Sequence, residues 1–74
     1  MILLRNLLRK GVLDGAVTLE ILNALNGSTV KQVDVTVGAS GYEDDKIELN
    51  WGSWVVDSIS AKNNALVVSI FNDD

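Results

Sequence analysis

The feature that most constrains the fold is a pair of alternating segments on either side of Asn26-Gly27. Residues 16–22 and residues 30–37 carry apolar side chains at every second position, which is the pattern of a half-buried β-strand. These apolar positions are Val17, Leu19, Ile21, Val33, Val35 and Val37. A helix over residues 16–26 that ends at Gly27 is the competing interpretation. The choice decides whether the domain is mixed or almost purely β.

The register of the hairpin favours strands. A three-residue loop over residues 25–27, with Gly27 in the left-handed conformation, aligns apolar residues with apolar ones and polar residues with polar ones. The predicted pairs are Val17 with Val35, Leu19 with Val33, Thr18 with Asp34 and Glu20 with Gln32. A two-residue Asn-Gly turn would instead set the apolar row of each strand against polar residues. We therefore expect a β-hairpin.

A short amphipathic helix is predicted before this hairpin, within residues 1–11. Its apolar side is a stripe of leucines, Leu3, Leu4, Leu7 and Leu8. Arg9 and Lys10 lie near the C-terminal end, where the helix dipole favours positive charge, and Gly11 supplies the stop. So short a helix is not stable alone in water, so the leucine stripe must pack against another part of the protein.

Two further hairpins are predicted in the second half of the chain. Residues 45–51 alternate as a strand, and Gly52-Ser53 then forms a turn that makes Trp51 and Trp54 cross-strand partners. A three-residue loop over residues 62–64 closes the last hairpin. Its predicted pairs are Val56 with Ile70 and Ser60 with Leu66 on the inner face, and Val55 with Phe71 and Ile59 with Val67 on the outer face.

The expected fold is mainly β, of the α+β class, in a single domain over residues 1–74. The helix at residues 1–11 is followed by a five-stranded antiparallel meander over residues 15–72. An open sheet would expose its apolar face, so the meander is expected to curl into a small SH3-like or Sm-like barrel. Its predicted inner face consists of Val17, Leu19, Ile21, Val33, Val35, Ile47, Leu49, Trp51, Trp54, Val56, Leu66, Val68 and Ile70.

A short helix that leads into such a meander resembles the Sm-like barrel of the Hfq and LSm proteins. Residues 17–21, Asn26-Gly27 and residues 30–37 are similar to the first hairpin of that family. The resemblance implies a ring-shaped oligomer that binds RNA. In place of the family's RNA-contacting loops, this chain has residues 38–45 and residues 61–63.

Composition excludes much catalytic chemistry. The 74 residues include no histidine and no cysteine, so imidazole bases, thiolate nucleophiles and the commonest zinc ligands are missing. The acidic cluster Glu43, Asp44 and Asp45 has neither the ligand spacing of a calcium loop nor a neighbouring base or nucleophile. We expect no catalytic residue, no metal site, no cofactor and no enzymatic activity.

The charges are unevenly distributed along the chain. The first ten residues carry +3 and residues 11–74 carry −7, which gives the net charge of −4. This split favours contact between the basic segment and an acidic surface, including one on another copy of the chain, and the net sign disfavours RNA as a partner. The first apolar run ends after four residues, at Arg5, so no export signal or membrane span is predicted and a cytoplasmic protein is expected.

The predicted protein interface is an apolar row on the outer face of the sheet, made of Val55, Ile59, Val67 and Phe71. A solvated sheet face usually carries polar residues, so the row needs a cover, either the leucine stripe or another protein surface. The sequence thus favours a small soluble, non-catalytic protein-interaction or self-assembling module, whose partner is another protein or a second copy. The alternatives are an Sm-like RNA-binding ring and a small acidic inhibitor encoded by a phage or mobile element.

Overall fold

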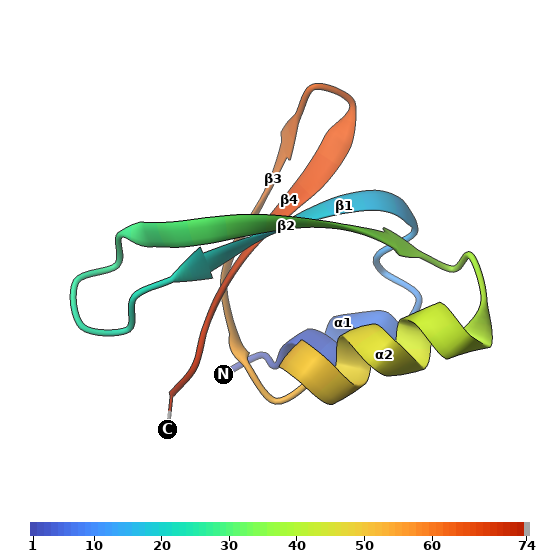
Figure 1. The fold of residues 1–74 in the computed structure, drawn as a ribbon, viewed down its shortest axis with the longest axis horizontal. Helices are drawn as coiled ribbons and strands as arrows, with labels where there is room; N and C mark the ends of the chain where they lie inside the picture. The colour runs from blue at the N-terminus through green and yellow to red at the C-terminus, as the bar shows by residue number, and fades with distance from the viewer. Residues whose placement is uncertain (74) are drawn as a thin grey trace.

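Two β-hairpins meet in one mixed sheet, and two helices cover one face of that sheet (Figure 1). The computed structural model describes residues 1–73. The elements are α1 (Leu4–Arg9), β1 (Gly15–Leu22), β2 (Thr29–Val37), α2 (Gly41–Trp51), β3 (Val55–Lys62) and β4 (Ala65–Phe71). The strand order is β2-β1-β4-β3, with the antiparallel hairpins β1–β2 and β3–β4 joined by parallel pairing of β1 with β4.

The first hairpin has the predicted register. All four predicted pairs are present, Val17 with Val35, Leu19 with Val33, Thr18 with Asp34 and Glu20 with Gln32. The strand interpretation of this segment is therefore confirmed. Gly27 is left-handed, with φ of 75°. The loop spans residues 23–28 and is longer than predicted, and an extra residue in β2, Val30, sets Leu22 opposite Thr29.

Replacing Gly27 with alanine should lower the free energy of unfolding by about 1 kcal/mol. A Cβ at Gly27 would meet no other atom within 4 Å, so the cost comes from the left-handed backbone alone. Urea unfolding followed by circular dichroism measures the loss. Gly41→Ala is the matched control, because Gly41 has equal space but lies in the first turn of α2, where alanine is favoured. Equal stability of the two variants would contradict the turn described here.

The prediction of a strand at residues 45–51 is wrong, because this segment lies in α2. Ser40 caps the start of the helix, where its hydroxyl oxygen accepts a hydrogen bond from the Glu43 amide at 3.1 Å. A strand would place Ile47 and Leu49 on one face. In the helix they point apart, so Ile47 is 5 % exposed and Leu49 is 87 % exposed.

The predicted five-stranded barrel does not form, since the sheet has four strands and stays open. Because α2 replaces the third strand of the meander, the chain crosses the inner face of the sheet from β2 at one edge to β3 at the other (Figure 1). The predicted hairpin turn between Trp51 and Trp54 is therefore wrong as well. The Gly52 amide donates to the Glu48 carbonyl at 2.8 Å and ends α2 instead.

The second hairpin keeps only part of its predicted register. The confirmed pairs are Val55 with Phe71 and Val56 with Ile70. Asp57 is then an extra residue in β3, and this bulge turns Ile59 to the inner face. The pairs beyond the bulge are Ile59 with Val68 and Ser60 with Val67, in place of Ile59 with Val67 and Ser60 with Leu66. The turn has two residues, Asn63 and Asn64, whose positive φ angles suit a type I′ turn.

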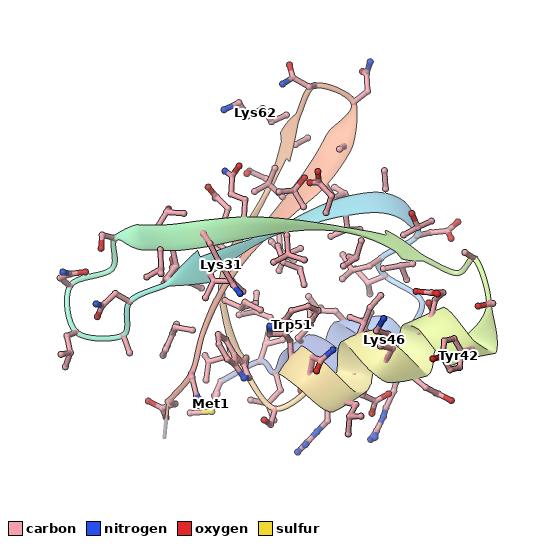
Figure 2. All side chains as sticks on the ribbon, in the orientation of Figure 1. Met1, Lys31, Tyr42, Lys46, Trp51 and Lys62 are labelled. Atoms are coloured by element: carbon pink, nitrogen blue, oxygen red, sulfur yellow. The ribbon has the colours of Figure 1, made fainter. Side chains whose placement is uncertain are left out.

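The core lies between the helices and the inner face of the sheet. Its least exposed side chains are those of Leu4, Val17, Leu19, Val68 and Ile70. Trp51 points from α2 toward the sheet and is half-buried (Figure 2). The predicted packing of the leucine stripe is confirmed for Leu4 and Leu7, which lie in this core.

The N-terminal segment joins the two layers. The Val56 amide donates to the Ile2 carbonyl at 2.8 Å, so residues 2–4 run beside the start of β3. From α1, Arg9 forms a salt bridge with Glu48 of α2. One residue of the basic segment is therefore paired with a carboxylate of the same chain.

Candidate functional site

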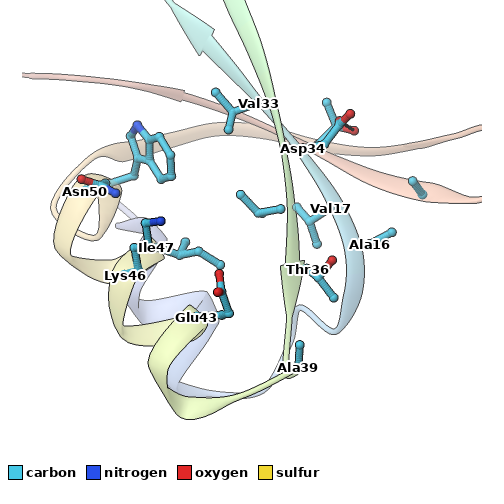
Figure 3. A pocket seen from close by; sticks show the side chains of 14 residues that line it. Ala16, Val17, Val33, Asp34, Thr36, Ala39, Glu43, Lys46, Ile47 and Asn50 are labelled. Atoms are coloured by element: carbon cyan, nitrogen blue, oxygen red, sulfur yellow. Dashed lines mark hydrogen bonds between the residues drawn. The ribbon is translucent and has the colours of Figure 1, made fainter.

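A groove of about 860 Å³ opens between α2 and β2 (Figure 3). Val33 and Val35 line it on the strand side, and Ile47 and Trp51 line it on the helix side. The two valines point to the inner face, yet they are only half-buried. The groove therefore offers an apolar surface that the rest of the domain does not fill.

Polar side chains of α2 form the rim of this groove. Glu43, Lys46 and Asn50 follow one another at spacings of three and four residues, so they share one side of the helix. Figure 3 shows them on the side of α2 that faces β2. Within residues 1–73, neither Glu43 nor Lys46 takes part in a salt bridge. The rim charges are thus available to a partner.

The strand beside the groove is an edge strand. β2 lies at the end of the strand order, and within residues 1–73 no other segment pairs with its free edge, the edge that points away from β1. Unpaired edges invite a further strand, and proteins usually blunt them with charges, bulges or covering segments. Here the bulge at Val30 and the charge of Lys31 lie together at one end. Residues 32–37 continue as a regular strand.

Two lysines lie on the inner side of the sheet, and of the two only Lys46 lines the groove. Lys31 belongs to the inner face, because it is opposite the core residue Ile21. Figure 2 shows Lys31 extending from β2 toward the helical layer and Lys46 extending from α2 toward the strand. Arg9–Glu48 is the salt bridge within the described part of the chain, so neither lysine is neutralised by a carboxylate there.

The four predicted interface residues do not form one row. Val55, Val67 and Phe71 lie on the outer face as predicted, but the bulge at Asp57 places Ile59 on the inner face. Val55 and Val67 are 8 % and 9 % exposed, so they offer little surface to another protein. The prediction of a continuous outer row is therefore wrong. An interface role for the individual residues stays a prediction.

The cover of Val55 comes from the N-terminal segment. Leu3 forms an isolated antiparallel bridge with Val55, whereas Leu4 and Leu7 turn into the core. On the outer face, Val55 is opposite Phe71 of β4, and Phe71 is opposite Leu22 of β1. An apolar row thus crosses one end of the outer face.

The remainder of the outer face carries a polar network. Glu20 accepts hydrogen bonds from Ser69 Oγ and Gln32 Nε2, both at 3.1 Å, and so connects three neighbouring strands. Thr18 Oγ1 donates to the carboxylate of Asp34 at 2.9 Å. These side chains are satisfied by one another, which is typical of a solvated sheet face.

The acidic cluster has a structural use. Asp44 accepts a hydrogen bond from the Gly38 amide at 2.9 Å, and Glu43 lies in the first turn of α2, where negative charge is favoured. In the described residues, no group of three or more His, Cys, Asp or Glu side chains is placed to hold a metal ion. No helix among residues 1–73 is long and apolar enough to span a membrane.

The helix that forms one wall of the groove could have been predicted from one local signal. Ser40 is followed three residues later by Glu43, which is the pattern that starts a helix, and Ile47 and Trp51 then follow at helical spacing. That pattern would have set Glu43, Lys46 and Asn50 on a common face. No local signal marks β2 as an edge strand, because its position depends on the pairing of β1 with the distant β4.

No protein-family model matches the chain, and comparisons with curated proteins and with solved structures gave no match. The features of the molecule that bear on its function are the groove and, within residues 1–73, the unpaired edge of β2 and the unpaired charges of Lys31 and Lys46.

Proposed function

We propose that the protein is a small non-catalytic module that binds an extended segment of another polypeptide by adding it as a strand to β2. The observation that supports this proposal is the unpaired edge of β2, which lies directly beside a groove with an apolar floor. An edge strand and a groove together provide the two parts that recognition by strand addition needs.

The backbone of β2 would supply affinity. Residues 32–37 form a regular strand whose outward N–H and C=O groups can bond to a new neighbour. Every second side chain of the added strand would then point to the inner face. There it would meet Val33 and Val35 from the strand and Trp51 from α2. The groove would thus supply specificity.

Two other hypotheses are an inhibitor protein and an Sm-like RNA-binding ring. The small size and acidic charge suggest an inhibitor of another protein, and such an inhibitor could bind its target through the same edge of β2. The Sm-like resemblance stays a prediction, and it predicts single-stranded RNA binding that weakens as salt rises. The apolar groove favours a polypeptide instead.

Selection from a library of short random peptides tests the proposal. We expect peptides to be selected and to shift the backbone amide resonances of β2 and α2 in titrations followed by nuclear magnetic resonance. Val35→Lys should abolish this binding, because it places an ammonium group in the apolar groove. Gln32→Lys is the matched control, since Gln32 is exposed, points to the outer face of the same strand and does not line the groove, and it should bind as the parent does.

Two outcomes would contradict the proposal. Peptide binding that survives Val35→Lys and is lost in Gln32→Lys would place the contact on the outer face. A protein that selects no peptide, yet binds single-stranded RNA more weakly as salt rises, would instead support the Sm-like alternative. Circular dichroism of both variants checks that the sheet is intact.

A further inference from the structure

The inner-face position of Lys31 restricts which strand the edge of β2 can accept. Lys31 is opposite Ile21 within the sheet, and the next inner-face residues of β2 are Val33 and Val35. A strand added outside β2 would set one of its own inner-face side chains directly opposite Lys31, at the distance where cross-strand pairs interact. An apolar side chain there would cover the ammonium group without pairing it, whereas a carboxylate would pair it.

A second copy of this chain fits the edge poorly. Two β2 strands related by a two-fold axis pair antiparallel, with inner-face residues opposite inner-face residues. An axis at Val33 sets Lys31 of each copy opposite Val35 of the other, and an axis at Gln32 sets Lys31 opposite Val33. An axis at Asp34 sets the two Asp34 carboxylates opposite each other. These registers leave Lys31 without a carboxylate or oppose like charges, which destabilises the pair.

Lys31 therefore resembles the inward-pointing charges that protect edge strands from self-pairing. Protection by charge is selective, because a partner that carries the opposite charge at the facing position removes the penalty. Lys46 lies on the rim of the neighbouring groove, which Lys31 does not line, and also lacks a salt bridge within residues 1–73. Glu43 on the same rim offsets the charge of Lys46, so the preference for an acidic side chain in the added strand rests on Lys31.

We infer that β2 accepts a strand from another protein with a carboxylate opposite Lys31, apolar residues opposite Val33 and Val35, and a basic residue opposite Asp34. This inference rests on the proposed function. The added strand is antiparallel, since antiparallel ladders are slightly more stable per residue. From its N-terminus onward, the added strand carries an apolar residue, a basic residue, a second apolar residue, a residue of any type and an acidic residue. No segment of this protein has that pattern, which again points to a foreign partner.

A charge exchange tests the inference. The probe is a blocked peptide with the core valine-lysine-valine-threonine-glutamate between flanking threonines, and its control has lysine in place of glutamate. The glutamate peptide should bind the parent, and Lys31→Glu should weaken this binding about fivefold or more. The lysine peptide should bind Lys31→Glu better than it binds the parent. Lys31 is exposed, so the variant should keep the parent's fold.

The second part of the test concerns self-association. Sedimentation equilibrium should find the parent monomeric and Lys31→Val associating as its concentration rises, because the substitution removes the charge that opposes pairing of two β2 edges. A parent that already dimerises through β2 would make the second copy the occupant and would overturn the inference. Lys31→Val that stays monomeric at every concentration would also contradict it.

The remaining outcomes separate the inference from the proposed function. If both peptides bind the parent and Lys31→Glu equally and shift β2 amides, strand addition stands and the charge selectivity is wrong. If the library yields peptides that shift β2 amides but lack the acidic position, the selectivity is wrong in the same way. If neither the designed peptides nor the library shifts β2 amides, the proposed function fails as well.

Discussion

Val55→Asp should leave little folded protein at room temperature. Val55 is 8 % exposed and lies between two apolar neighbours of its row, Leu3 on one side and Phe71 on the other. A carboxylate there loses water without gaining a partner, which costs roughly 3 kcal/mol or more. A domain of this size has little stability to lose. Circular dichroism with urea unfolding measures the loss.

Ile59→Asp is the control for this prediction. Ile59 was predicted to share a row with Val55, but it lies beyond the bulge and is 46 % exposed. Its substitution should cost about 1 kcal/mol or less, as expected for a surface position. Similar, large losses in both variants would restore the continuous row that the sequence predicts. Val55→Asp with the parent's melting temperature would show that Leu3 does not cover Val55 in solution.

The contrast between these two residues shows where sequence reasoning stops in this protein. The register of β1 with β2 could be predicted, because the two strands are adjacent in the chain and their alternating pattern fixes one alignment. The pairs at the start of the second hairpin match the prediction because two differences cancel, since the turn is one residue shorter than predicted and the bulge adds one residue to β3. The bulge at Asp57 has no apolar or glycine signal, so every pair beyond it is displaced by one position.

The error at residues 45–51 has a different cause. Ile47, Leu49 and Trp51 alternate as they would in a strand, and a segment this short also fits a helix in which only Ile47 and Trp51 face inward. The capping pattern at Ser40 and Glu43 favours the helix, whereas the alternation favours the strand. Because α2 crosses to the far edge of the sheet, one wrong element changed the predicted topology from a closed meander to an open mixed sheet.

The candidate site follows from that topology. The inner-face position of Val33 and Val35 could be predicted from their alternation, and so could the loop between β2 and α2. Their incomplete burial could not, because it depends on how far two short helices reach beneath the edge strand. The inward charge of Lys31 was visible as a break in the apolar pattern of β2, but its meaning requires knowledge that β2 lies at the edge.

Leu4→Ala should lower the free energy of unfolding by about 2–5 kcal/mol and the melting temperature by at least about 8 °C. The Leu4 side chain is fully buried, and its amide donates to the Trp54 carbonyl at 2.9 Å, so α1 is held against the turn that follows α2. Leu25→Ala is the matched control, since Leu25 is 96 % exposed and should lose about 0.5 kcal/mol or less. Equal losses would mean that α1 is not packed beneath the sheet in solution. Because Arg9 joins α1 to Glu48 of α2, a loosened α1 should also displace the wall of the groove and weaken peptide binding.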